Sequence, residues 1–372
     1  MRGHIRKRGS TWTIVLYMGM VEGKPKYKWV GGFKTRKEAE AAMAEYVAQL
    51  EKGMYADSQN LTLEEYLTKW LKDYAEIKVA QTTFATYIDA VNHIKEYLGH
   101  IKLEKLRPAD IQAFISHLSR ETNLSIRSVR YFYAILNIAL NTAVKWQLIA
   151  HNPCDAVTPP QKTKQNMQIL TSEQVNELLT GAKDTPLYVP ILLAVTCGLR
   201  RGEILGLYWD SVDLQNNIIT VTRSIVKTPD GKILEKNPKS NAGVRAVTIP
   251  DITVKALRAL RKKQLENKLH LGQEYKDNNL VCCWDDGTPF YPDYLSQGFK
   301  KLLKKLNLPD NVRFHDLRHT HATLLLQQGV HPKVVQERLG HSSVSITLDT
   351  YSHVLPTLQK EAANKIDDLL NS

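Results

Sequence analysis

A proline-rich, basic stretch divides the chain into parts that cannot share one hydrophobic core. Residues 157–164 read VTPPQKTK, in which two adjacent prolines precede polar and cationic side chains. Proline locks the backbone and withholds an amide donor, and a stretch with so few apolar side chains cannot pack a core. We therefore expect a linker here and a domain boundary after residue 160. Residues 161–372 suffice for one large domain, at ~100–200 residues per domain.

The charge of the chain favours a polyanionic partner. Its 372 residues carry a formal net charge of +12, and the excess of Lys and Arg is concentrated towards the two ends. Such a balance favours nucleic acid first and an anionic membrane surface second. The longest apolar stretch, near residues 189–199, is about half of the ~20 residues that a membrane-spanning helix needs. The charged N-terminus lacks the apolar core of a secretory signal, so we expect a soluble, intracellular protein.

The four cysteines predict neither disulfides nor a zinc knuckle. They form no CxxC pair and two of them are adjacent: Cys154, Cys197, Cys282 and Cys283. This pattern excludes a disulfide framework and fits a reducing cytosol. A Gly-x-x-x-x-Gly-Lys-Ser/Thr loop is also missing from the sequence, so we expect no nucleotide-driven step.

Residues 1–57 predict a small α+β module, a three-stranded sheet plus a helix. Two segments, 11–18 and 26–33, are rich in β-branched and aromatic residues and read as strands. Thr35 and Glu38 form a capping box before a helix over residues 39–50. The sheet could lie in a DNA groove, with Lys28 and Trp29 as candidate DNA-binding residues. The alternative is that its aromatic side chains pack against the helix.

Residues 58–160 predict an all-helical domain. Helices are expected over about 63–74, 82–98, 109–118 and 125–144, with Pro108 at the first position of the third. Apolar residues recur at helical spacing along the fourth. Arg127 and Arg130 near its start are candidate phosphate contacts, although a solvated helix face explains them equally well.

Residues 161–372 predict a mixed α+β domain that is mostly helical. Thr171 and Gln174 cap its first helix. Strands are expected near 218–226, 232–234 and 244–249, and the Asp230–Gly231 pair predicts the turn between the first two.

The most informative stretch is FHDLRHTH, residues 314–321, and three interpretations of it stay open. His315 and Arg318 are three apart, so on a helix they share a face and could grip an oxyanion. His315, Asp316, His319 and His321 faintly echo a metal-binding helix, although the glutamate base of such enzymes is missing. The third interpretation is plain structural packing.

Three further segments carry candidate polar residues. TCGLRRGEILGL, residues 196–207, places arginines where one helix ends and another begins past Gly202. A buried arginine needs a partner, and Glu203 could be that partner of Arg200 or Arg201. In RLGHSS, Gly340 fits a helix C-cap and His341 follows it at the corner. DTYSHV places Tyr351 about ten residues further on.

The order of these segments resembles that of the tyrosine recombinase, or phage integrase, family. TCGLRRGEILGL, PKSNAGVRAVTI, FHDLRHTHATLLLQQGV, LGHSS and DTYSHV occur in sequence across about 170–354. The N-terminal layout resembles integrases of Gram-positive temperate phages and conjugative transposons. The resemblance implies an arm-type DNA-binding domain at 1–57, a helical, SAM-like core-binding domain at 58–160 and a catalytic domain at 161–372.

The resemblance also implies a catalytic set with no metal and no cofactor. Its members would be Arg200, Lys239, His315, Arg318, His341 and Tyr351, with Glu203 in support. Lys236 is a less favoured substitute for Lys239, and the sequence leaves open which histidine is the base. Tyr351 would attack a DNA phosphodiester and form a 3′-phosphotyrosyl bond, so that a site-specific recombinase integrates and excises a mobile element.

The resemblance further implies the partners. These are double-stranded DNA at attachment core and arm sites, a homotetramer on that DNA, an excisionase and a host DNA-bending protein, in the bacterial cytoplasm at the nucleoid and away from membranes. An amphipathic tail over residues 355–370 would dock on a neighbouring protomer. Two rival functions remain, a DNA-binding regulator without chemistry and a metal-dependent nuclease. Among recombinases, a resolvase-like housekeeping enzyme is the runner-up to an integrase.

Overall fold

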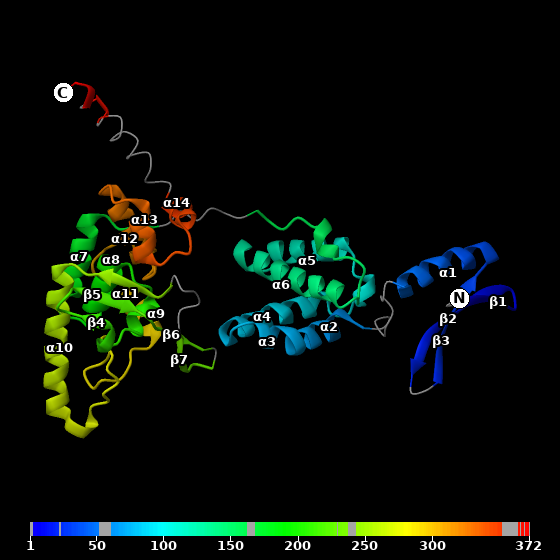
Figure 1. The fold of residues 1–372 in the computed structure, drawn as a ribbon, viewed down its shortest axis with the longest axis horizontal. Helices are drawn as coiled ribbons and strands as arrows, with labels where there is room; N and C mark the ends of the chain where they lie inside the picture. Colours follow the sequence, from blue (N-terminus) through cyan, green and yellow to red (C-terminus); the bar gives the residue numbers. More distant parts are fainter. Residues whose placement is uncertain are drawn as a thin grey trace. The chain divides into compact units, whose positions relative to one another are not determined.

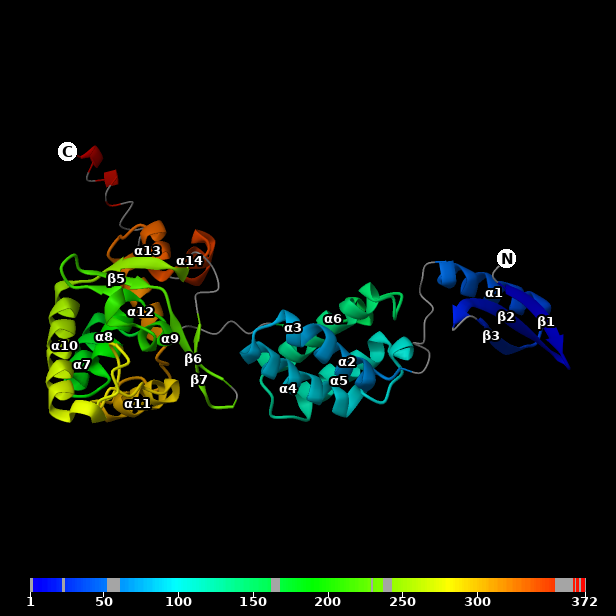
Figure 2. The same cartoon turned by 60° about the horizontal axis from the view of Figure 1, so that its bottom comes forward.

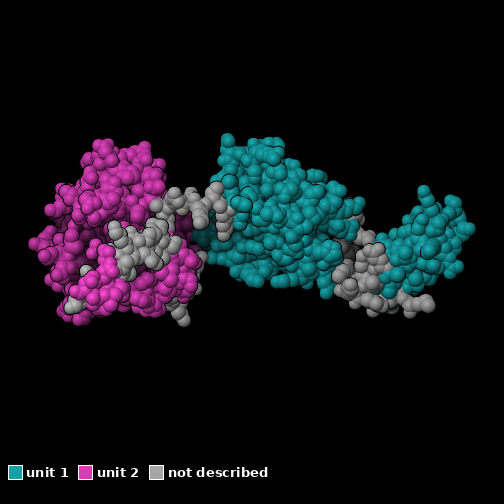
Figure 3. Space-filling model, turned by 90° about the horizontal axis from the view of Figure 1, so that it is seen from above, with its two compact units in different colours: residues 1–164 teal, residues 165–372 magenta. Residues whose placement is uncertain are grey.

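The chain forms two compact units, residues 1–164 and residues 165–372 (Figure 3). The computed structural model describes residues 3–21, 24–51, 61–161, 168–228, 230–236 and 243–351, together with 364, 366, 367 and 369–371. The expected domain boundaries at residues 57 and 160 stay predictions. In the described part, no helix is long and apolar enough to cross a membrane.

The N-terminal module is a three-stranded antiparallel sheet with one helix, as the sequence predicts. Its strands lie in the order β1 (Gly3–Arg8), β2 (Thr11–Val21), β3 (Lys24–Phe33), followed by α1 (Arg36–Glu51) (Figure 1). Ile14 and Leu16 are fully buried in a cluster with Ala39 of α1. The sequence analysis located β2, β3 and α1 but placed no strand at β1. That strand is mostly charged and exposed, so it lacks the apolar alternation that marks a strand.

The helical part of the first unit matches the expected elements closely. Its helices are α2 (Leu63–Trp70), the π-helix η2 (Leu71–Ala75), α3 (Glu76–Lys78), α4 (Gln81–Leu98), η3 (Leu103–Lys105), α5 (Pro108–Arg120), α6 (Ile126–Lys145) and η4 (Pro153–Ala156). Pro108 occupies the first turn of α5, and Ser125 caps α6. The apolar stripe of α6 is buried in the core of this bundle. Local signals therefore sufficed to predict these helices.

The second unit is mostly helical and is built around α8. Its helices are α7 (Ser172–Ala182), α8 (Tyr188–Cys197), α9 (Arg201–Leu205), η5 (Trp209–Ser211), α10 (Asp251–Leu271), η7 (Gly272–Glu274), α11 (Pro292–Lys305), α12 (Asp316–Gln327), α13 (Pro332–Leu339) and α14 (Val344–Tyr351). The α8 residues from Val189 to Val195 are all buried. A helix that is apolar on every side is surrounded by protein. This central helix ends at Gly198, beside the candidate site.

The strands of the second unit form two separate sheets, which corrects one expectation. β4 (Val212–Asp213), β5 (Ile218–Val221) and β8 (Arg245–Thr248) make one sheet, whereas β6 (Ser224–Lys227) and β7 (Ile233–Lys236) make a hairpin (Figure 2). The single strand expected over 218–226 is therefore two strands. Both Gly202 and Gly206 of the α9 region lie so close to β6 that a Cβ atom would meet it within about 3 Å. Packing against α9 thus separates β6 from β5.

Two local expectations have different outcomes. The hairpin turn at Asp230–Gly231 is confirmed for β6 and β7, and Gly231 has a φ of +83°. α9 begins at Arg201 rather than past Gly202, because a capping box between Arg200 and Glu203 starts it earlier. Most of the expected tail over 355–370 lies outside the described residues.

Candidate active site

Arg318 is buried between the ends of two helices. α8 and α13 each end on a left-handed glycine, Gly198 with φ 66° and Gly340 with φ 64°. The guanidinium of Arg318 donates from Nη1 to the Gly198 carbonyl at 2.7 Å and from Nη2 to the Leu339 carbonyl. Carbonyls at a helix C-terminus lack helical partners and carry partial negative charge. They therefore hold an arginine that is only 2% exposed.

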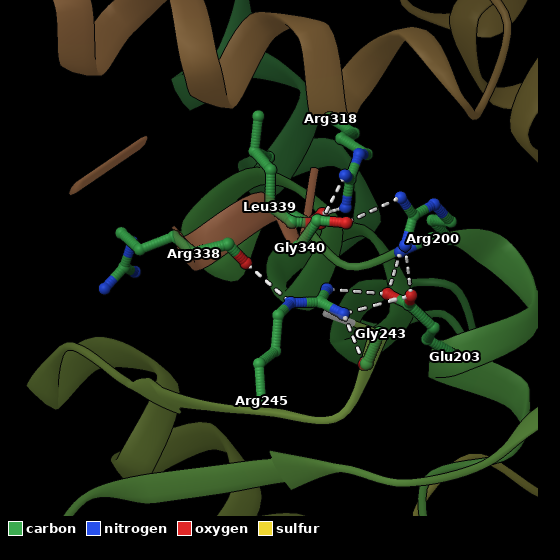
Figure 4. A network of polar contacts seen from close by, with 9 residues as sticks. Arg200, Glu203, Gly243, Arg245, Arg318, Arg338, Leu339 and Gly340 are labelled. Carbon is green, nitrogen blue, oxygen red and sulfur yellow. Dashed lines mark hydrogen bonds and ion pairs between the residues drawn. The ribbon is translucent and has the colours of Figure 1, made fainter. Parts of the chain in front are cut away.

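Arg200 reaches the same corner from α9. It is the N-cap residue of that helix, where its backbone N–H and its Nη1 both donate to Glu203, at 2.9 and 2.6 Å. Its Nη2 lies 3.5 Å from the Gly340 carbonyl. Figure 4 shows the guanidiniums of Arg200 and Arg318 at adjacent carbonyls, Leu339 and Gly340. The structure therefore brings together two arginines that are far apart in the sequence.

Arg245 is a residue of this network that the sequence analysis did not single out. It comes from β8 and donates from Nη1 and Nη2 to the two carboxylate oxygens of Glu203, at 3.1 and 2.8 Å. Its Nε donates to the Arg338 carbonyl at 2.7 Å and its Nη1 to the Gly243 carbonyl at 3.3 Å (Figure 4). Arg245 thereby ties β8 to α9 and to the end of α13.

Glu203 is charged because two arginines surround it. Burial opposes ionisation of the carboxyl, but hydrogen bonds and charge from Arg245, and then charge from Arg200, lower the pKa of Glu203 to about 2. A buried carboxylate with such partners is stable only while both arginines remain. Glu203 is thus the ion-pair partner of Arg200, and its supporting role in catalysis stays a prediction.

Tyr351 lies at the end of α14, and its hydroxyl contacts a histidine side chain. The side chain is 1% exposed, and its Oη is 2.8 Å from Nδ1 of His319. Burial raises the pKa of Tyr351 to about 12, against a smaller lowering by the charge of Arg318. The phenol is therefore protonated and shielded from water in the DNA-free chain.

Three histidines surround the buried phenol and the two arginines. The His319 ring lies between His315 and Tyr351, with ring centroids 5.3 and 5.7 Å away. Nδ1 of His341 is 2.9 Å from the Thr347 hydroxyl. Burial, followed by His315 for the first and Arg318 for the second, lowers the pKa of His319 and of His341 to about 4. Burial and Arg318 also lower the pKa of His315. All three imidazoles are therefore neutral at pH 7.

The remaining predicted residues are Lys239 and the candidate DNA contacts. Lys239 lies outside the described residues, and Lys28 lies in β3 with its side chain outside them. Trp29 is 49% exposed, with the Arg8 guanidinium 5.3 Å from its ring centroid. Arg130 donates to the Pro160 carbonyl, and Arg127 is exposed. The structure thus gives Arg130 a structural contact and leaves Trp29 and Arg127 accessible.

The side chains that the metal interpretation would use as ligands contact different partners. Asp316 binds Arg313 through both carboxylate oxygens, at 2.8 and 3.0 Å, and Nδ1 of His321 bonds to the Val195 carbonyl. In the ranges that the structure describes, no group of three or more His, Cys, Asp or Glu side chains is arranged to hold a metal ion. The arrangement instead favours the oxyanion interpretation of His315 and Arg318.

Sequence signals existed for two site residues that the expected catalytic set omits, although His319 was named as a candidate metal ligand. Arg245 occupies an inward position of β8, whose burial alternates, so a charge there implies a buried partner. His319 is four residues after His315, one helical turn away. Neither signal tells which residue the side chain meets, because the partners Glu203 and Tyr351 lie on other elements.

Three family models match this chain. Residues 168–357 match the phage integrase family, residues 62–119 match the phage integrase N-terminal SAM-like domain, and residues 4–50 match the Arm DNA-binding domain. A tyrosine recombinase XerC-like protein of Caldanaerobacter subterraneus subsp. tengcongensis is 30% identical over 358 residues, covering 90% of each chain. The ICEBs1 integrase of Bacillus subtilis is 30% identical over 339 residues, covering 90% of this chain and 91% of its own.

Solved structures share the fold. An integrase of the Tn1549 transposon, in complex with a circular intermediate DNA, has a TM-score of 0.71 at 21% identity, covering 82% of this chain and 99% of its own. The lambda integrase in a tetramer bound to a Holliday junction has a TM-score of 0.58 at 20% identity, covering 92% and 96%. These likenesses cover both compact units.

Proposed function

Because the chain belongs to the phage integrase family, we propose that Tyr351 is the nucleophile with which it cuts and rejoins DNA. The chain is a DNA-binding tyrosine recombinase, an integrase of the kind found in phages and conjugative elements. The observation that carries the residue assignment is the meeting of Arg200 and Arg318 at one helix end, close to the buried phenol of Tyr351. Two cations beside a nucleophile suit attack on a phosphodiester.

The two arginines would bind the phosphate undergoing attack. In the transition state, extra negative charge develops on the non-bridging oxygens, and two planar guanidiniums can donate paired hydrogen bonds to them. Arg200 is held by Glu203 and Arg318 by backbone carbonyls, so little reorganisation is needed. Preorganised donors of this kind typically contribute on the order of 10²–10³ each in rate.

The other members of the set would move protons. A tyrosine attacks poorly while protonated, and a buried one needs both a base and nearby positive charge. By resemblance His315 is a candidate base, His341 donates a further hydrogen bond to the phosphate, and Lys239 protonates the leaving 5′-oxygen. The energy of the phosphodiester is conserved in the 3′-phosphotyrosyl bond, so a 5′-hydroxyl can reverse the step without ATP, metal or cofactor.

The proposed partners are those that membership of the family implies. Core DNA would be held by the helical domain, with Arg127 as a phosphate contact, and the N-terminal sheet would bind separate arm sites through Lys28 and Trp29. The active assembly would be a homotetramer in which the tail after Tyr351 docks on a neighbouring protomer. An excisionase and a host DNA-bending protein would set direction, in the bacterial cytoplasm at the nucleoid.

Substitution of the nucleophile tests the proposal. A core site is first selected by binding from a random duplex library, and nicked suicide duplexes are built around it. In EDTA and without ATP, the wild type should form a covalent protein–DNA adduct on a denaturing gel, and Tyr351→Phe should form none while binding the same DNA. Tyr291→Phe and Tyr294→Phe are matched controls that keep the adduct.

Three other outcomes would each favour a different nucleophile or a different function. Tight binding without an adduct from the wild type would favour the DNA-binding regulator. An adduct that survives in Tyr351→Phe and disappears in Tyr291→Phe or Tyr294→Phe would move the nucleophile. Cleavage that EDTA abolishes would favour the metal-dependent nuclease.

A sulfur leaving group tests Lys239 as the general acid. A thiol has a pKa near 8.5, so a 5′-bridging phosphorothiolate departs without a proton. We expect Lys239→Ala to lower the rate of adduct formation on ordinary DNA by a factor on the order of 10²–10⁴. The same variant should cleave the sulfur substrate at nearly the wild-type rate. Lys236→Ala should be close to wild type on both. Rescue of Lys236→Ala instead would transfer the role to that residue.

A further inference from the structure

His319 makes the one contact to the Tyr351 hydroxyl that the described part of the structure records. It follows Arg318 in α12 and is absent from the set that the resemblance assigns. Its Nδ1 is 2.8 Å from Oη of Tyr351, within the ~2.6–3.2 Å required of a general base. His315, a candidate base in the set that the resemblance implies, contacts the His319 ring edge to face, at an interplanar angle of 89°.

The direction of this hydrogen bond follows from the protonation states. Burial, and then the proximity of His315, lowers the pKa of His319 to about 4, so its imidazole is neutral at pH 7. Burial raises the pKa of Tyr351 to about 12, so its phenol carries the hydrogen. Because the described residues offer the Tyr351 hydroxyl no other acceptor, we assign it as the donor to Nδ1, which places the proton of the neutral His319 on Nε2.

We propose that His319, rather than His315, is the catalytic residue that takes the proton of Tyr351. As the Oη–P bond forms and the P–O5′ bond breaks, the hydroxyl proton passes from Oη to Nδ1, and the 5′-oxygen receives a proton from Lys239. In the rejoining step, the 5′-hydroxyl attacks phosphorus and returns its proton to Lys239, while the imidazolium returns its proton to the departing Tyr351. Atoms and charge balance in both directions without a further reactant.

The charges around His319 make this transfer favourable only when DNA is bound. The titratable groups that face it are His315, Asp316 and Arg318 of α12, Arg313 just before that helix, His341 at the α13–α14 corner and Tyr351. Apart from the carboxylate of Asp316, these neighbours are cationic or neutral. A phosphate held by Arg200 and Arg318 adds negative charge and so stabilises the imidazolium. Proton transfer is thereby coupled to substrate binding.

Substitution by asparagine separates proton transfer from hydrogen bonding. Asparagine can place an acceptor oxygen near the position of Nδ1 but cannot take a proton. We expect His319→Asn to lower the adduct rate at pH 7 by on the order of 10²–10⁴. Its rate should then rise tenfold per pH unit, as hydroxide replaces the base, whereas the wild type reaches a plateau. His315→Asn should keep that plateau, and His270→Asn, an exposed position on α10, should match the wild type.

Two outcomes would overturn this assignment. One is a His319→Asn enzyme with the wild-type rate or pH profile, and the other is loss of the plateau in His315→Asn alone. Thermal unfolding and core-site binding show whether each variant is folded, and His319→Gln serves if His319→Asn is not.

A measurement on the intact site removes the dependence on folding of those variants. In ¹⁵N-histidine spectra of the full chain, Tyr351→Phe should shift the Nδ1 resonance of His319, and an unchanged resonance would refute the contact. The inference rests on Tyr351 as the nucleophile. The proposed function and this inference can be told apart by their failures. If the wild type forms no adduct, the proposed function is refuted. If adduct formation does not depend on His319, only the assignment of His319 as the base is refuted.

Discussion

Single charged residues in this site hold one another in place. Glu203 accepts from Arg200 on one side and from both Nη atoms of Arg245 on the other. The side chains of Glu203 and Arg245 are 7% and 6% exposed, so water cannot replace a lost partner. Removal of one member of a buried ion pair typically costs more than the pair contributes, because the other charge is left uncompensated. Arg245 therefore acts on Arg200 through Glu203.

We expect Arg245→Lys to impair both stability and cleavage. Lysine keeps the charge but cannot donate in a fork to Glu203 and to the Arg338 carbonyl, so the free energy of unfolding should fall by about 1.5–3 kcal/mol. The adduct rate should fall further than DNA affinity, because Arg200 is no longer fixed. Chemical denaturation and suicide-duplex cleavage measure the two effects, and Arg258→Lys on the exposed face of α10 is the control. Strictly additive losses in a cycle with Glu203→Gln would refute the coupling.

At the scale of elements, the ends of two helices, rather than their lengths, determine how Arg318 is held. α8 and α13 both stop at left-handed glycines, and the carbonyls of Gly198 and Leu339 then meet on Arg318. A Cβ atom on Gly198 would come within 2.7 Å of the His321 ring and 2.8 Å of a Leu339 methyl. Glycine is therefore needed at this cap for both its backbone angle and its size.

Alanine substitutions at two glycines separate those two requirements. Gly329 also has a positive φ, +75°, but an added Cβ there meets nothing within 4 Å. Gly329→Ala should lower stability by about 1–2 kcal/mol through backbone strain alone, with normal cleavage. Gly198→Ala should lower the melting temperature more and slow adduct formation, because it displaces the carbonyl that holds Arg318. Equal effects of the two substitutions on cleavage would show that the Gly198 cap does not position Arg318.

At the scale of the whole molecule, candidate DNA-binding features occur on more than one part of the chain. The N-terminal sheet exposes Trp29 and Tyr27, at 49% and 52%, while Ile14 and Leu16 pack towards α1. The candidate active site lies wholly in the second unit, from α8 to α14.

Deletion of residues 1–57 should therefore separate two DNA-binding activities. We expect the shortened chain to form the covalent adduct on the selected core site at a rate within a few-fold of the full chain. It should lose binding to a second, arm-type duplex selected with the full chain, and Trp29→Ala should weaken that binding alone. The slope of log K against log salt on arm DNA falls by about 0.9 for each phosphate that the protein no longer neutralises. Unchanged arm binding after the deletion would refute the module's role.

The sequence by itself determined the family and most of the elements, β1 and the separation of β5 from β6 excepted. Capping boxes at Thr35 and Thr171, the apolar stripe of α6 and the ordered motifs are local signals. The structure and the family matches confirm the fold class and the integrase relationship. Such signals suffice because hydrogen bonds within a helix, and the face that it buries, depend on neighbours three or four residues away.

Only the tertiary structure decided which side chains meet. Packing around α8 brings Arg245 onto Glu203, 42 residues away, and Tyr351 onto His319, 32 residues away. It also moves β6 out of the sheet of β5, against the glycines of the α9 region. Sequence spacing reports neighbours within one element, whereas these contacts join different elements whose approach depends on side-chain volume throughout the core.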